Sequence, residues 1–179
     1  MQVFLGIALP SAIRSALAVQ QFLLPLPRKV DLAQLHLTLV FLGEVNDRML
    51  EAAHDGFSTL RMQPFDLTLS GLGLFGGARA RAAWAGVAPS PLLGRLQAKA
   101  ERVARVAGCQ VETRRFAPHV TLGHFPPPAP EDAMRLERAV AMGGSFQAGP
   151  FAVSEMVLWQ STPSAAGPRH DELTRYPLD

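Results

Sequence analysis

The sequence predicts an α+β protein of two similar lobes related by a pseudo-twofold axis. Two observations predict this class. Strand-like and helix-like segments follow one another in the same order in both halves of the 179-residue chain, and short motifs recur at matching places in that order. A sheet with one apolar face buries that face against helices and leaves the other face free. We therefore expect two antiparallel sheets that line a central groove, with helices on the outside.

The first half opens with an apolar segment at residues 2–9 that has the pattern of a strand. Pro10 and Ser11 follow it, and Ser11 is a favourable N-cap residue for a first helix. A proline-rich loop at 24–28 comes next. The later elements expected in this half are a strand at 36–42 closed by Gly43, a helix at about 47–61, and an alternating strand at 65–72.

The second half repeats this order. We expect a strand at 82–87, a helix at 91–106, a strand at 119–125, a helix at 131–141, a strand at 151–160 and a last strand near 172–178. In the helix at 91–106, the spacing predicts that Leu92, Leu96, Val103 and Val106 face the core.

Two motifs indicate an internal repeat. The sequence Ala8-Leu9-Pro10-Ser11 resembles Val87-Ala88-Pro89-Ser90, and a His-x-Thr-Leu motif recurs 83 residues apart, one strand later in each half. The whole chain, 1–179, is then a single domain of two interleaved lobes. An ordinary single-sheet α/β domain, in which the repeat is a coincidence, is the alternative.

The composition favours a compact protein of a reducing compartment. Apolar residues make up 48% of the chain and charged residues 18%, which is sufficient for a buried core. No apolar run reaches the roughly 18 residues of a membrane span, and the opening segment lacks the basic region of a signal peptide. Cys109 is the single cysteine, so an intrachain disulfide is excluded. We expect a cytoplasmic protein.

The repeated motif is His36-Leu37-Thr38-Leu39 in the first half and His119-Val120-Thr121-Leu122 in the second. Alternate residues of a strand project to opposite faces, so the histidine and the threonine of each motif share one face. The apolar residues then share the other face. Two such strands side by side would place two imidazoles and two hydroxyls around one groove.

This set of side chains is suited to acid–base chemistry on an anion. Near neutral pH, one histidine can be neutral and accept a proton while the other is charged and donates one. Zinc binding is the competing explanation for the histidines. A catalytic zinc site needs three protein ligands, and neither motif has a carboxylate or thiol beside its histidine.

Two segments resemble the paired signatures of the 2H phosphoesterase superfamily. They are His36-Leu37-Thr38-Leu39-Val40-Phe41-Leu42-Gly43-Glu44-Val45 and Phe116-Ala117-Pro118-His119-Val120-Thr121-Leu122. The similarity extends over essentially the whole chain. It is strongest to the bacterial and archaeal RNA 2′,3′-cyclic phosphodiesterases, historically called 2′-5′ RNA ligases.

The resemblance implies a bilobal fold and assigns roles to the motif residues. His119 would be the proton acceptor that activates water, and His36 the proton donor to the departing 3′ oxygen. Thr38 and Thr121 would bind the non-bridging phosphate oxygens. The implied reaction opens a terminal 2′,3′-cyclic phosphate on RNA to a 2′-phosphate without a metal, and the same groups could join a 2′,3′-cyclic end to a 5′-hydroxyl by a 2′-5′ bond.

The chain departs from the family pattern at several positions. The family often has a basic residue where Val40 stands, Arg or Thr where Ala117 stands, and Arg where His124 stands. Arg28 matches an arginine that the family places eight residues before the first histidine, but a neighbouring aromatic position is Lys29 here. These departures concern RNA affinity and substrate preference rather than the two-histidine core.

Further substrate-binding candidates lie near the motifs. Candidate cations for an electropositive rim are Arg28, Lys29, Arg114, Arg115 and His124, although each is equally well explained as a solvated surface charge. Phe41 and Phe116 are candidates for stacking on a base, with core packing as the alternative.

The resemblance implies RNA ends that carry a 2′,3′-cyclic phosphate as the substrate, tRNA fragments among them, with no cofactor and no membrane association. We expect a monomer, because the internal repeat supplies both halves of the site. Two other functions stay open. One is a phosphodiesterase of small cyclic phosphates derived from nucleotides or ADP-ribose, and the other is a nucleotide- or RNA-binding module without catalysis.

Overall fold

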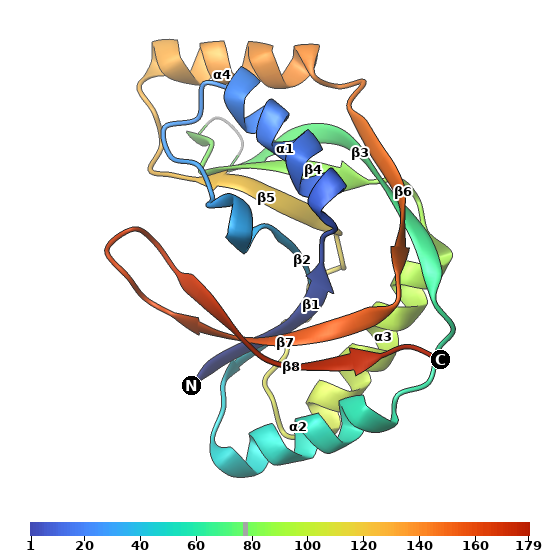
Figure 1. Cartoon of the computed structure of the whole chain (residues 1–179). Helices are drawn as coiled ribbons and strands as arrows, with labels where there is room; N and C mark the ends of the chain where they lie inside the picture. Colours follow the sequence, from blue (N-terminus) through green and yellow to red (C-terminus); the bar gives the residue numbers. More distant parts are fainter. Residues whose placement is uncertain (77–78) are drawn as a thin grey trace.

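The structure is a computed structural model that describes residues 1–76 and 79–179 (Figure 1). Its strands are β1 (Gln2–Ala8), β2 (His36–Glu44), β3 (Phe65–Phe75), β4 (Ala82–Val87), β5 (His119–His124), β6 (Gln147–Val153), β7 (Glu155–Thr162) and β8 (Arg169–Pro177). Its helices are α1 (Ser11–Leu23), the short 3₁₀ helix η1 (Leu32–Gln34), α2 (Asp47–Thr59), α3 (Pro91–Val106) and α4 (Pro130–Met142).

The eight strands form one antiparallel sheet in the order β6-β3-β4-β5-β2-β1-β7-β8. The predicted α+β class and its antiparallel strands are therefore confirmed. The structure differs from the expectation of two sheets in one respect. The two four-stranded halves join into a continuous sheet where β2 pairs with β5, at Leu37 opposite Val120.

The helices are exchanged between the two halves of the sheet. α1 follows β1 in the chain but packs against β5 and β6 of the other half, whereas α3 follows β4 and packs against β2. α4 packs against β3, and α2 packs against α3. Figure 1 shows the consequence, with α1 and α4 at one end of the molecule and α2 and α3 at the other. Each four-stranded half of the sheet is thus covered in part by a helix that connects two strands of the other half.

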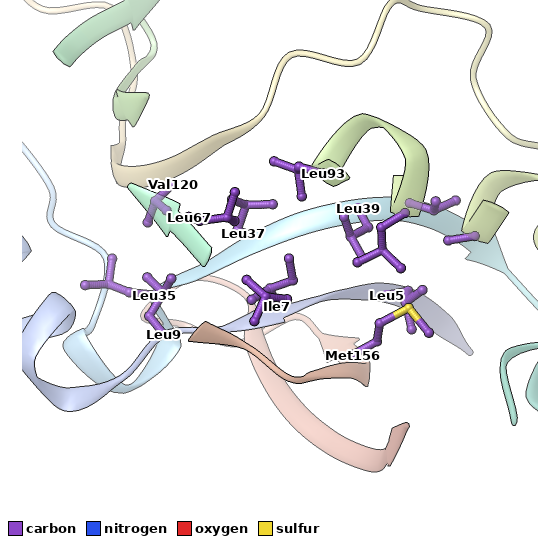
Figure 2. Close-up of a cluster of buried hydrophobic side chains, with 14 of the residues drawn as sticks. Leu5, Ile7, Leu9, Leu35, Leu37, Leu39, Leu67, Leu93, Val120 and Met156 are labelled. Atoms are coloured by element: carbon purple, nitrogen blue, oxygen red, sulfur yellow. The ribbon is translucent and has the colours of Figure 1, made fainter. Parts of the chain in front are cut away.

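The core lies between the sheet and these helices, and the side chains of the two central strands contribute to it. Leu37, Leu39 and Val120 are at most 3% exposed. Figure 2 shows Leu93 of α3 close to Leu37 and Leu39 of β2. Burial of these side chains fixes which face of β2 points inward, since a one-residue slip would turn every side chain to the opposite face.

Several predicted details were wrong. The segment expected as one strand at 151–160 is divided at Ser154 into two strands, β6 and β7, and β6 begins earlier than expected and contains Pro150. Proline donates no ladder hydrogen bond and is tolerated at a sheet edge, which is where β6 lies. The first helix begins at Ser11 itself, and its N-cap is Pro10.

The inward face of α3 also differs from the prediction. Its buried residues are Leu93, Leu96, Ala100 and Ala104, while Leu92 and Val106 are exposed. Alanines let α3 approach the sheet closely, and a pattern that weighs large apolar residues most heavily misses them. Among the described residues, no helix is long and apolar enough to cross a membrane.

Candidate active site

The two His-x-Thr motifs lie on β2 and β5, the neighbouring central strands of the sheet. Each motif alternates as the sequence predicted. His36, Thr38, His119 and Thr121 are partly exposed, while the residues between them are buried. Because Leu37 pairs with Val120, the residues on either side of this pair share the opposite face of the sheet. The structure therefore brings the four predicted residues to one surface.

Both histidines are oriented in the same way by the backbone. His36 Nδ1 lies 2.7 Å from the carbonyl oxygen of Gln34, and His119 Nδ1 lies 2.8 Å from that of Ala117. A carbonyl oxygen only accepts, so Nδ1–H donates in both contacts, and Nε2 is the nitrogen that can gain or release a proton. His36 Nε2 is 3.1 Å from Thr38 Oγ1. Each imidazole thus has Nε2 available for proton transfer.

An aromatic cluster surrounds His36. The centre of its ring is 4.8 Å from that of Phe4, 5.4 Å from Trp159 and 5.1 Å from His170, with the His170 ring edge-on. These neighbours exclude water from the ring. The pKa of His36 is lowered to about 4, chiefly by burial; the Gln34 hydrogen bond opposes this shift, and nearby His170 and His119 add to it. His36 is therefore neutral at pH 7 in the free protein.

His119 has different neighbours. Phe75, on β3, contacts its ring edge-on at 4.9 Å between centres, and Trp84 of β4 lies beside Phe75 at 5.4 Å. The strand partner of His119 is Gly86, where a Cβ would lie 2.7 Å from the backbone oxygen of Ser70. The strand partner of Thr38 is Gly6, where a Cβ would lie 2.4 Å from the oxygen of Leu37. Glycine in both strands thus permits close backbone packing beside the motifs.

A bulge in β2 redirects the residues after the first motif. Thr38 pairs with Gly6 and Val40 with Leu5, so Leu39 has no partner of its own in this register. Leu39 and Val40 are both buried as a result, and Phe41 becomes 62% exposed. Val40 is part of the core, which accounts for the absence of a basic residue there. Phe41 contacts Phe4 at 5.9 Å between ring centres, beside the aromatic cluster of His36.

The other predicted substrate contacts are more dispersed. Arg28, Lys29 and His124 are exposed, and they lie together because Val30 N–H bonds the oxygen of Leu122 and the backbone of Arg28 lies against Gly123. Arg114 and Arg115 are exposed on the loop before β5, where Arg114 forms an ion pair with Glu112. Phe116 packs against the hydrophobic core. Ala117 supplies a backbone carbonyl, so the hydrogen bond to His119 needs no polar side chain there.

Sequence reasoning missed the neighbours that come from distant strands. Phe4, Trp159, His170 and Phe75 lie near the motifs in space. Gln34 also connects His36 to His170 through hydrogen bonds. Phe4 lay in a strand that was predicted correctly, and its alternation with Val3 and Leu5 could have placed it on the histidine face. His170 had no local pattern that linked it to His36.

The residues present do not form an obvious metal site. In residues 1–76 and 79–179, no group of three or more His, Cys, Asp or Glu side chains is arranged to hold a metal ion. The histidine Nδ1 atoms are used by backbone carbonyls, and a hydroxyl is near Nε2 of His36.

The fold and these two motifs define a phosphoesterase-like protein. A structure described as a phosphoesterase aligns with a TM-score of 0.80 at 28% identity, covering 99% of this chain and 97% of that one. Escherichia coli LigT complexed with 3′-AMP aligns with a TM-score of 0.74 at 27% identity, covering 99% and 96%.

The family model of the 2′-5′ RNA ligase superfamily matches residues 9–164, and this chain belongs to that family. The chain is also 30% identical to the RNA 2′,3′-cyclic phosphodiesterase of Escherichia coli, over 99% of its own length and 96% of that protein. A protein of the same name from Aeropyrum pernix is 29% identical over 82% of this chain and 83% of its own.

Proposed function

We propose that this protein is an RNA 2′,3′-cyclic phosphodiesterase. The observation that carries the proposal is the placement of two His-x-Thr motifs on adjacent central strands, with both Nδ1 atoms bonded to carbonyls and both Nε2 atoms available. Its relatives named RNA 2′,3′-cyclic phosphodiesterase support the same activity.

In the proposed reaction, His119 Nε2 takes a proton from water as the water oxygen attacks phosphorus. The bond from phosphorus to the 3′ oxygen breaks, and His36 Nε2–H protonates that oxygen, so the product is a 2′-phosphate with a free 3′-hydroxyl. Thr38 and Thr121 donate hydrogen bonds to the non-bridging oxygens, where negative charge increases in the transition state. With a 5′-hydroxyl in place of water as the nucleophile, the same groups would form a 2′-5′ linkage: the 5′ oxygen bonds to phosphorus, and the 3′ oxygen leaves as a hydroxyl.

The donor role requires His36 to be protonated when substrate is bound, although burial keeps it neutral in the free protein. The phosphate anion of the substrate supplies the opposite charge that favours imidazolium. Proton uptake by His36 is therefore linked to substrate binding. The protein acts as a monomer without metal, and the exposed group of Arg28, Lys29 and His124 attracts the RNA backbone. Phe41 is exposed where it can stack on a base, whereas core packing makes Phe116 a weaker candidate.

The activity is tested with an oligoribonucleotide that ends in a 2′,3′-cyclic phosphate, in the presence of EDTA. We expect conversion to the 2′-phosphate, with His36→Ala and His119→Ala each slower by about 10²–10⁴-fold. His54→Asn is the matched control, because this substitution removes a histidine outside the site. His54 is an exposed residue of α2 that is hydrogen-bonded to Tyr176. Turnover of a cyclic mononucleotide but not of the oligonucleotide would favour the small-molecule alternative. No turnover of either would favour a binding module.

The two histidine roles are separated by an analogue in which sulfur replaces the 3′ oxygen. A thiolate leaves without protonation, so this substrate needs no general acid. We expect His36→Ala to approach wild-type rates on the sulfur substrate, while His119→Ala stays slow on both. Rescue of His119→Ala instead would reverse the assignment of donor and acceptor.

A further inference from the structure

His170 of β8 lies against His36, although nothing in the repeated motifs points to it. In the sheet order, β1 and β7 separate β8 from β2, yet the two imidazole centres are 5.1 Å apart. The His170 ring also meets Phe4 edge-on at 4.8 Å. This ring therefore covers one side of the catalytic histidine.

Gln34 connects the two histidines through both its backbone and its side chain. Its backbone oxygen accepts the hydrogen bond from His36 Nδ1–H. Its side-chain Oε1 accepts from the backbone N–H of His170 at 2.6 Å, and Nε2 lies 3.5 Å from the backbone oxygen of His170. The side-chain amide of Gln34 thus contacts the N–H and the carbonyl oxygen of one residue of the edge strand β8, as the backbone of a neighbouring strand would. One residue fixes the His36 ring and holds the segment that carries His170.

Hydrogen bonding by its side chain does not explain why residue 170 is a histidine. Within the part of the chain that the structure describes, Nδ1 of His170 is buried and has no hydrogen-bond partner. A buried polar atom without a partner is costly, and an apolar residue of similar shape would avoid that cost. The contact that the ring does make is with His36 and Phe4.

We propose that His170 is a positioning residue: held by Gln34, its ring packs against the His36 imidazole and fixes the direction of Nε2 toward the substrate. Without this ring, His36 would keep its bond to the Gln34 carbonyl but would gain freedom to tilt and would be open to water on that side. A misplacement of about 1 Å in a reacting group costs on the order of 10²-fold in rate. The proposal rests on the proposed phosphodiesterase activity, but it also predicts a property of His36 that is measured without substrate.

The variants His170→Ala and His170→Phe separate the ring from its nitrogens. Both leave the backbone groups of His170 available to Gln34. We expect His170→Ala to lower kcat on the order of 10–100-fold and to change KM by less than about threefold, because the threonines still bind the phosphate. His170→Phe restores the ring and should recover most of kcat. Gln34→Leu removes the side-chain link to β8 while leaving both histidines, and should lower kcat in the same direction.

The second readout is the titration of His36, followed by NMR of the histidine ring protons in the free protein. We expect its pKa to rise from about 4 toward the ordinary 6.5 in His170→Ala, because water reaches the ring. It should stay low in His170→Phe. The other ionisable groups around this contact are His119, and Asp171, whose carboxylate pairs with Arg169. His119, Asp171 and Arg169 are all retained in these variants. His54→Asn serves as the control for the loss of a histidine elsewhere.

Two results would overturn the proposal. In the first, His170→Ala keeps both the wild-type kcat and the wild-type titration of His36. In the second, His170→Phe is as impaired as His170→Ala, which would assign the role to the ring nitrogens rather than to packing. If the wild-type protein proves inactive on cyclic phosphates, the proposed function fails, and the titration still decides whether His170 positions His36.

Discussion

The low pKa of His36 predicts that anion binding to this site takes up a proton. The shift from 6.5 to about 4 corresponds to about 3 kcal/mol between the two protonation states. At pH 7, only about one molecule in a thousand then carries a charged His36 in the free protein. Part of the binding free energy of an anion that requires a charged His36 is used to protonate this residue. The affinity of such an anion therefore still depends on pH well below 6.5, where an ordinary histidine is already charged.

Sulfate is a suitable probe, because it is a tetrahedral oxyanion that keeps its charge over this pH range. Between pH 4.5 and 6, we expect its Kd to rise about tenfold per pH unit, measured by calorimetry. A histidine with a pKa of 6.5 is already charged over most of this range and would give a nearly flat dependence. His36→Gln is the control, since the amide keeps the size and polarity of the side chain but does not titrate.

A flat dependence in the wild-type protein between pH 4.5 and 6 would refute the reasoning, because it would mean that the aromatic cluster does not keep His36 neutral. An equal slope in wild type and in His36→Gln would also refute it, since the proton would then be taken up elsewhere. Calorimetry in two buffers of different ionisation enthalpy counts the protons directly. We expect close to one proton per sulfate at pH 6, lost in His36→Gln.

The remaining predictions concern catalysis, acid stability, packing and domain organisation. Thr38→Val and Thr121→Val should each lower kcat by about 10²-fold with little change in Tm, since each removes one donor to the phosphate oxygens. The free energy of unfolding should fall by about 3 kcal/mol as the pH drops from 6.5 through 4, because the unfolded chain binds a proton at His36 that the folded protein resists; chemical denaturation of wild type and His36→Gln measures this. Gly6→Ala should destabilise the fold by about 1–3 kcal/mol through overpacking against Leu37, whereas Gly94→Ala, at an open and exposed helical position, should stabilise it by about 0.5–1 kcal/mol. A single domain of interleaved lobes predicts one unfolding transition by every probe, and separate transitions would contradict it. A monomer predicts a sedimentation mass of 19.3 kDa, and a dimer would contradict that.

The sequence predicted the parts of the molecule that depend on local pattern. The strand at Ala82–Val87 and the helix at Pro91–Val106 have the expected bounds. The two motifs lie on the expected strands and face, because alternation along a strand directly determines which residues share a side. The repeat predicted two similar lobes, and the continuous sheet has four strands on either side of the β2–β5 pairing.

The sequence did not predict features that depend on pairing between distant segments. The β2 bulge moves Val40 into the core and Phe41 to the surface, and it is defined by register with β1 rather than by the residues of β2. The proximity of His170 to His36 likewise depends on how the β7–β8 hairpin approaches η1. Such contacts arise from the curvature of a whole sheet, which a local pattern does not encode.

The two His-x-Thr motifs supply matching groups to the site, but the surroundings of the two histidines differ. Both histidines have the same hydrogen bond to the carbonyl two residues earlier, so both present Nε2. His36 is then enclosed by Phe4, Trp159 and His170, whereas His119 meets Phe75. In the proposed reaction the two histidines act as donor and acceptor, so the difference between their surroundings bears directly on how each one performs its role. The strands β7 and β8 therefore do more than extend the sheet, because the side chains they add on one side only make two equivalent histidines chemically different.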